Sequence, residues 1–193
     1  MRSCADRARA AALPAAALLA CAVASAGTEV KEALARHGPV ELDAGGARVA
    51  LARLAFSDVV VSTDGAEALV VAMVEADGRV LLEGAEPSLA YVGREAFRME
   101  RCPGRRWCLA PGALAGLRGV VAALAAAPRA PGARPVAWQV RVEREAAEAG
   151  EDVEAPDGPS SGPEARGGGA PRRLRVRHAL ARAGDGWRLA PAP

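Results

Sequence analysis

Apolar and polar residues alternate along much of this chain, and a period of two predicts β-strands with one buried face. Residues 136–143 place valine or tryptophan at every second position, with Gln, Arg and Glu between them. Residues 173–180 repeat the alternation, with apolar residues between arginines. Further stretches with strand character are 51–61, 66–74, 79–82 and 89–100. The sequence therefore predicts a domain built mainly from one sheet.

Two Asp-Gly pairs, Asp64-Gly65 and Asp77-Gly78, lie between these stretches. Asp-Gly favours the tight turns that join neighbouring antiparallel strands. We therefore expect a hairpin at each pair, and an antiparallel meander over the first half of the chain.

Two stretches have helical spacing. Residues 113–127 place leucine and valine on one stripe, and a proline follows. Gly116 and Gly119 interrupt this stretch, and each lowers helix stability by about 1 kcal/mol relative to alanine. Glycine at these positions could allow the helix to pack closely against the sheet. Residues 28–36 form a shorter helical segment. The predicted fold is α+β, an antiparallel sheet packed against one main helix and a short N-terminal helix.

The length of 193 residues fits a single domain. Residues 149–171 are rich in Gly, Pro, Ser and acidic residues. This composition is typical of a flexible segment, so we expect a mobile insertion at the tip of a long hairpin within a 27–193 domain.

The first 26 residues have the pattern of a signal peptide. Three arginines precede an apolar stretch over residues 10–20, and small residues follow it. Ala24-Ser25-Ala26 fits cleavage at 26/27, whereas Leu18-Leu19-Ala20-Cys21 resembles a bacterial lipobox with cleavage at 20/21 and lipidation of Cys21. Both routes stay open, so we expect an exported protein that is either periplasmic or a lipoprotein tethered to the outer membrane.

Cys102 and Cys108 are the cysteines outside the signal and its lipobox. Export to an oxidising compartment favours a disulfide between them, and the intervening Pro-Gly supports a turn. A zinc site would need two more ligands, and the histidines, His37 and His178, lie far away in the chain. We expect a disulfide, no metal and no cofactor.

The formal net charge of +2 is too small to favour nucleic acid or an anionic membrane surface as partner. A membrane contact is expected only through the lipid anchor. No phosphate-binding loop or G-x-S-x-G motif is present outside the Gly-rich insertion.

Two residues are weak candidates for catalysis. His178 shares the parity of Leu174, Val176 and Leu180, so it should point inward and could serve as a pocket acid or base. A hydrogen-bonded core histidine is the more common role for such a residue, and no partner carboxylate can be named. Asp58 is the second candidate, with an edge or turn aspartate as its simpler interpretation.

Charged residues of one sign gather over Arg172–Arg177. They could bind an anion, but we expect Glu143 and Glu145 to face them across the hairpin. Cross-strand ion pairs of this kind stabilise a sheet by about 0.2 to 1 kcal/mol each, which explains the strip as a solvated face.

The pattern W-x-L-A-P occurs twice, at 107–111 and at 187–191. If this repeat is structural, the sheet is built twice from a similar hairpin, with Trp107 and Trp187 as equivalent anchors.

Residues 113–190, which end in Gly184-Asp185-Gly186-Trp187-Arg188-Leu189, resemble the nuclear transport factor 2-like (SnoaL-like) superfamily. The resemblance implies a curved, cone-like sheet with an apolar pocket, in a family of isomerases, dehydratases, cyclases and non-catalytic exported domains. The long first helices and the Asp-His pair of the enzymes have no counterpart here. We therefore expect a non-catalytic envelope domain that binds a partner protein or a small apolar ligand. The alternative is an isomerase or cyclase that uses His178.

Overall fold

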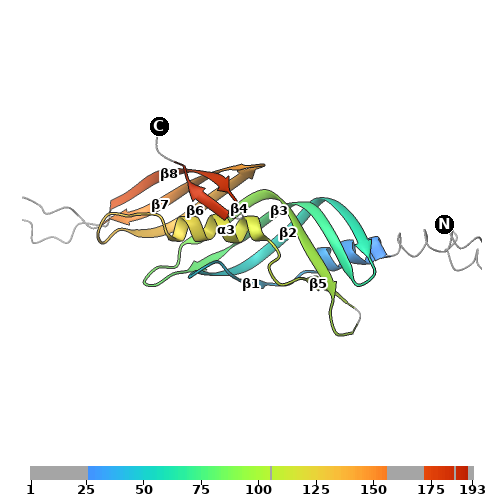
Figure 1. The fold of residues 1–193 in the computed structure, drawn as a ribbon. Coiled ribbons are helices and arrows are strands. Elements are labelled where there is room, and N and C mark those ends of the chain that lie inside the picture. Colours follow the sequence, from blue (N-terminus) through green and yellow to red (C-terminus); the bar gives the residue numbers. More distant parts are fainter. Residues whose placement is uncertain (1–25, 105, 156–171, 185, 191–193) are drawn as a thin grey trace, which may run out of the picture.

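The computed structural model describes residues 26–104, 106–155, 172–184 and 186–190 (Figure 1). A helix covers residues 26–35 at the start of this part. The elements that follow are β1 (Val40–Asp43), β2 (Arg48–Asp64), β3 (Glu67–Leu81), β4 (Ser88–Arg101), β5 (Trp107–Leu109), α3 (Ala115–Ala125), β6 (Arg134–Glu143), β7 (Ala146–Ala155), β8 (Arg172–Ala183) and β9 (Gly186–Leu189).

All described strands belong to one curled sheet, in the order β1-β2-β3-β4-β6-β7-β8-β9. Short β5 pairs with the end of β4. Neighbouring strands are antiparallel except β4 and β6, which are parallel over 88–93 and 137–142. Figure 1 shows α3 lying along one face of the sheet, as the sequence predicted for its main helix. The α+β class with a curved, mostly antiparallel sheet is therefore confirmed.

One of the two predicted Asp-Gly turns is present. The chain reverses between β2 and β3 at Gly65, whose φ of +60° suits glycine. At Gly78, by contrast, β3 continues straight on, and a Cβ there would collide with the carbonyl oxygen of Ala50. Gly78 thus serves a close approach of β2 at a register shift, and the hairpin forms later, around Gly84 with φ +75°.

The expected insertion begins later than its composition suggests. Residues 149–155 belong to β7, in which buried and less buried positions alternate. The buried positions are held by Ala147, Ala149, Glu151 and Val153, so Val153 is the one large apolar residue among them and the apolar signal is weak. The rest of the insertion, 156–171, lies outside the described residues.

The core fills the space between the sheet and the helices. Buried aliphatic residues come from every layer; in α3 they are Leu117, Val120, Val121 and Leu124. Gly119 lies directly against Trp187, because a Cβ on it would lie 2.8 Å from the Cδ1 atom. The interpretation of the helix glycines as close-packing positions is confirmed there. Trp138 is 1% exposed, whereas Trp187 is only partly buried.

Two strand pairs of the sheet repeat one pattern. In β4–β5 and β8–β9 a tryptophan faces an arginine and a leucine faces a large apolar residue; the pairs are Arg101–Trp107 with Arg182–Trp187, and Met99–Leu109 with Leu180–Leu189. The same two arginines donate their backbone N–H groups to turn carbonyls, Arg101 to Ala66 and Arg182 to Glu145. The first half (residues 26–109) and the second half (residues 115–189) therefore end in equivalent strand pairs.

This equivalence extends through the long hairpins. At the turn end, the pair Glu67–Glu100 in β3–β4 corresponds to Ala146–Ala181 in β7–β8. Equal steps along both hairpins from these pairs lead to two further matches. The pair Ala72–Glu95 corresponds to Glu151–Val176, and Val70–Phe97 corresponds to Ala149–His178.

Candidate functional site

A buried polar cluster surrounds Glu151, whose exposed fraction is 1%. Its Oε1 accepts hydrogen bonds from Trp138 Nε1 at 3.0 Å and from Arg129 Nε at 2.8 Å and Nη2 at 2.6 Å. Its Oε2 lies 2.7 Å from His178 Nε2. Because an ionised carboxylate can only accept hydrogen bonds, the Nε2 atom of His178 carries the proton in this contact.

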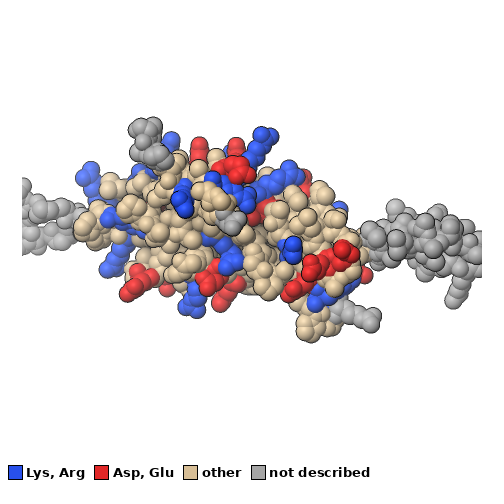
Figure 2. Space-filling model, in the orientation of Figure 1, with Lys and Arg blue, Asp and Glu red and all other residues tan. Residues whose placement is uncertain are grey.

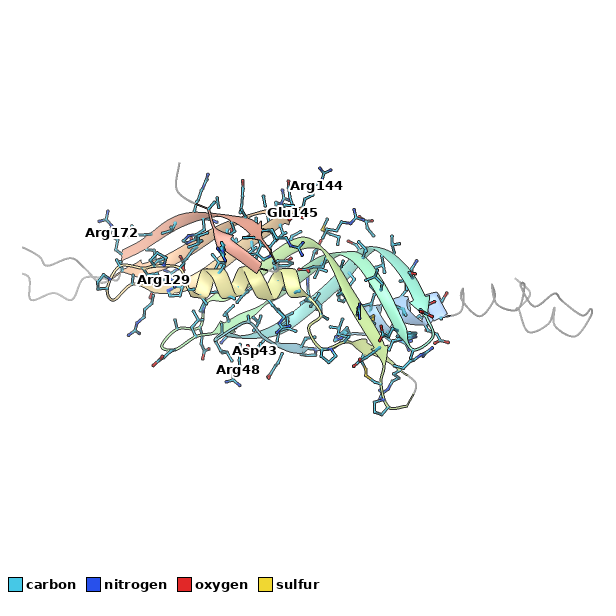
Figure 3. All side chains as sticks on the ribbon, viewed as in Figure 1. Asp43, Arg48, Arg129, Arg144, Glu145 and Arg172 are labelled. Carbon is cyan, nitrogen blue, oxygen red and sulfur yellow. A yellow bond between two sulfur atoms is a disulfide. The ribbon has the colours of Figure 1, made fainter. Side chains whose placement is uncertain are left out.

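The sheet and the end of α3 bring these groups together. Trp138 and Glu151 are cross-strand partners of β6 and β7, and His178 lies one row away on β8, opposite Ala149. Arg129 follows α3, and Figure 3 shows it at the end of that helix. Each side chain therefore comes from a different element.

The cluster keeps Glu151 ionised in the interior. Burial alone would raise the pKa of the Glu151 carboxyl, but hydrogen bonds from Trp138, His178 and Arg129, with the Arg129 charge, outweigh it. The pKa of Glu151 therefore lies below its ordinary value. These four contacts give the buried Glu151 charge the partners that it loses with the solvent.

Arg129 also binds the carboxyl-terminal end of α3. Its Nη2 donates to the carbonyl of Leu124 at 2.6 Å, and its Nη1 donates to those of Ala125 at 3.3 Å and Ala127 at 3.1 Å. A cation at this end of a helix interacts favourably with the helix dipole. Arg129 thus ties the helix to Glu151.

A second buried carboxylate, Glu95, binds the other end of α3. It accepts hydrogen bonds from the backbone N–H of Gly116 at 3.0 Å and of Leu117 at 2.6 Å, and from the Tyr91 hydroxyl at 2.5 Å. Burial and then the Glu95 charge raise the pKa of Tyr91 well above its ordinary value, so Tyr91 stays a neutral donor. A Cβ on Gly116 would lie 2.5 Å from the Glu95 carboxylate, which explains glycine there.

The two catalytic candidates do not meet. His178 points inward as predicted, with 12% of its side chain exposed, and Glu151 is the partner carboxylate that the sequence did not reveal. Asp58 is exposed and lies in the first half, where a register shift in β2 gives it a φ of 50°. Asp58 is thus a bulge residue outside the cluster.

The arginine strip forms cross-strand ion pairs, but with acids other than those expected. Arg173 pairs with Glu154 at 3.2 Å, and Arg175 lies 3.7 Å from Asp152. Both acids lie on β7, most of which the composition had assigned to the flexible insertion. Glu145 instead pairs with Arg182 at 3.9 Å, beyond the strip. Basic and acidic side chains are interspersed over the visible surface (Figure 2).

A groove of about 990 Å³ crosses the second half, with His178 in its lining. Its charged lining residues are Arg141, Glu148, Arg175 and Arg177, and Val92 and Leu189 add apolar surface. Side-chain alternation puts Val92 and Arg177 on the face opposite Trp138. Arg175 lies across Gly150, 3.2 Å from a Cβ built there, and donates to Gln139 at 2.5 Å.

Cys102 and Cys108 form a disulfide with Cα atoms 6.0 Å apart, as predicted. Within the described ranges, no group of three or more His, Cys, Asp and Glu side chains is arranged to hold a metal ion. No helix in that part of the chain has the length and apolar character needed to cross a membrane. Cys21 and the signal segment before residue 26 lie outside the described residues.

Comparisons of the chain with family models, curated proteins and solved structures give no match in any of the three.

Proposed function

We propose that this chain is an exported, non-catalytic binding domain of the cell envelope. The observation that carries the proposal is the state of Glu151 and Glu95. Each buried carboxylate accepts several hydrogen bonds from the interior, and each ties one end of α3 to the sheet. Groups held in this way stabilise a scaffold, whereas a general base needs contact with a substrate proton.

The groove on the second half is the proposed ligand-contacting surface. It combines apolar Val92 and Leu189 with three arginines and one glutamate, which suits a ligand or partner segment that is partly apolar and anionic. Arg175 is fixed by Gln139 and Asp152. Arg177 has no ion pair with any described residue and is therefore the arginine that a bound anion would meet.

Fluorescence titration with 1-anilinonaphthalene-8-sulfonate, an apolar anion, tests this surface. We expect saturable binding to the folded chain, and about 10- to 150-fold weaker binding in Arg177→Ser, because losing a charge-assisted hydrogen bond costs roughly 1.5 to 3 kcal/mol. Arg98→Ser is the matched control, since Arg98 is exposed on the first half. Equal affinity in all three proteins would refute the groove as the binding surface.

The second candidate is a pocket enzyme of the isomerase or cyclase kind with His178 as its base. It is favoured by one observation, the 2.7 Å contact between His178 Nε2 and the buried carboxylate of Glu151. Such enzymes remove a proton next to a carbonyl group. NMR of cyclohexanone in deuterated water tests for this step, and exchange catalysed by the wild type but not by His178→Phe would support the enzyme over the binding domain.

Export, cleavage at 20/21 or 26/27 and the choice between periplasm and lipid anchor belong to the same proposal. The arginines and apolar run before residue 26 support it. The mass of the amino-terminal peptide from the native host tests it, and an intact Met1 would contradict export.

A cone-like, nuclear transport factor 2-like relationship is likewise proposed. The curled sheet with α3 on one face supports it, as do Trp187 and the two residues after it. An experimental structure in which the sheet flattens beyond β8 would contradict it.

A further inference from the structure

The first part of β8 has an open strand edge. β8 pairs with β9 over Leu180–Ala183, and the backbone N–H of Ala190 extends this contact to the carbonyl of Ala179 at 2.7 Å. Before Ala179, residues 172–178 have a strand neighbour on the β7 side alone within the described chain. An unpaired edge of this kind is a template for pairing with another strand.

The backbone groups that face the open side belong to arginines. Successive residues of a strand direct their N–H and C=O groups to opposite sides. Ala179 bonds on the β9 side, and the β7–β8 register has no shift between 172 and 181. The odd-numbered residues of the open stretch therefore direct their backbone groups away from β7, and they are Arg173, Arg175 and Arg177.

The side chains at this edge differ between the two faces of the sheet. Leu174 and Val176 share the face of buried Leu180, yet they are 46% and 39% exposed. The three arginines lie on the opposite face, because side chains alternate along a strand. A strand added at this edge would place apolar side chains beside Leu174 and Val176, and acidic side chains beside the arginines.

β7, the neighbour on the other side of β8, already has this pattern. Val153 lies opposite Leu174, and the acids Asp152 and Glu154 lie opposite Arg175 and Arg173. Arg177 lies opposite Gly150 instead and has no ion pair with any described residue. β8 thus shows on one side what kind of strand it accepts, and it has charge left for a second one.

We propose that the 172–178 edge of β8 binds an extended segment of a partner protein in which acidic and apolar residues alternate. The segment adds a strand to the sheet: its backbone bonds to the odd-numbered arginines, and its acidic side chains meet their guanidinium groups. Residues 156–171 of this chain contain no valine, leucine or isoleucine, so they lack the required pattern. A second copy's β8 would place arginines opposite arginines, which is destabilising.

Isothermal titration calorimetry of the folded chain with synthetic peptides tests the edge. The probe is a capped peptide of alternating glutamate and valine, about seven residues long to span the open stretch. We expect the wild type to bind it and not to bind the peptide of alternating lysine and valine. Methyl groups on the backbone nitrogens of every second residue block one side of the peptide. At least one of the two methylation patterns should abolish binding.

Two variants of Arg175 separate backbone pairing from charge. Arg175→Pro removes an N–H that faces the open side and leaves the β7 contacts in place, so the chain should fold, as circular dichroism can verify, but lose peptide binding. Arg175→Ser keeps the N–H and should bind about two- to fivefold more weakly, the effect of one exposed cross-strand charge pair. Arg98→Ser is the control and should bind like the wild type.

Several results would overturn the proposal. They are a wild type that does not bind the glutamate peptide, equal affinity for the lysine peptide, binding of both methylated peptides, and unchanged binding by a folded Arg175→Pro. A peptide-free wild type that dimerises in sedimentation while Arg175→Pro stays monomeric would also overturn it, because a second copy would then occupy the edge. Anilinonaphthalene sulfonate has no peptide backbone, so the groove and this edge can fail independently.

Discussion

The β3–β4 hairpin of the first half and the β7–β8 hairpin of the second half share one backbone register but have different interiors. At one pair of equivalent positions the first half has Ala72 and Phe97, and the second half has Glu151 and His178. Phe97 packs on Phe56 with ring centroids 5.4 Å apart, whereas His178 binds the Glu151 carboxylate. The same architecture is therefore stabilised by apolar contact at one end and by a charged network at the other.

Each half nevertheless buries one carboxylate in the same row of its hairpin. In the first half it is Glu95 on β4, opposite Ala72, and in the second half it is Glu151 on β7, opposite Val176. Between them the two carboxylates hold the two ends of α3. The two halves thus bury their carboxylates on different strands, and each carboxylate serves one end of the same helix.

Glu151→Ala should have the largest effect on stability. It leaves the Arg129 charge and the polar atoms of Trp138 and His178 without their shared partner, and breaking a buried pair in this way costs about 3 to 5 kcal/mol. Urea unfolding followed by circular dichroism measures the change. Glu148→Ala on the exposed side of the same strand is the control and should change little.

The double variant Glu151→Ala, His178→Phe sharpens the comparison, because it gives the second half the residues of the first. It should recover part of the lost free energy of unfolding. A double variant less stable than Glu151→Ala would contradict the equivalence of the two positions.

The second half should also make the protein sensitive to acid. The pKa of Glu151 is lowered in the folded state, so its contribution is full above the pKa of an unfolded glutamate, about 4.3, and is lost as the pH falls through the folded value. Unfolding free energies measured from neutral pH downward should fall for the wild type. Glu151→Gln should show a shallower fall, and identical slopes would contradict this assignment.

The disulfide distinguishes the first half, since Ala183 and Arg188 hold the equivalent positions in the second. Replacing Cys102 and Cys108 by alanine should cost about 2 kcal/mol, because the closed loop is short. Thermal unfolding with and without reductant measures this effect. The reductant should lower the melting temperature of the wild type and leave the double-alanine variant unchanged.

The smallest expected effect concerns the connection between β7 and β8. Its counterpart in the first half is the short turn around Gly84. Replacing residues 156–171 by a turn of that length should change the unfolding free energy by only about 0.6 kcal/mol per halving of loop length. Extending the deletion back to residue 149 should unfold the domain, since it removes the buried Glu151.

The sequence predicted those features that a local pattern encodes. Alternation located β4, β6 and β8, and the Leu and Val stripe located α3. The repeated tryptophan motif predicted the equivalence of the short strands β5 and β9, and the register of both confirms it. Each of these predictions depends only on residues that are close together in the sequence.

The features that were missed depend on distant contacts. Gly78 has the sequence pattern of a turn residue, but in the fold β2 approaches it closely. β7 has the composition of a linker, because only Val153 among its inward positions is a large apolar residue. Glu151 is polar in the sequence and becomes a core residue only when Arg129, Trp138 and His178 surround it. The available signal was small: Ala147 and Ala149 flank Glu148, and Val153 follows at the same parity.

The parallel pairing of β4 and β6 bears on the order in which the chain folds. Every described antiparallel pair joins strands that follow one another in the chain, whereas residues 88–93 and 137–142 are separated by β5 and α3. Contacts of long sequence separation are slow to form. Each half should therefore assemble its hairpins independently, and the joining of β6 to β4 should be the late, rate-limiting step, with the helix that both carboxylates hold acting as the link between them.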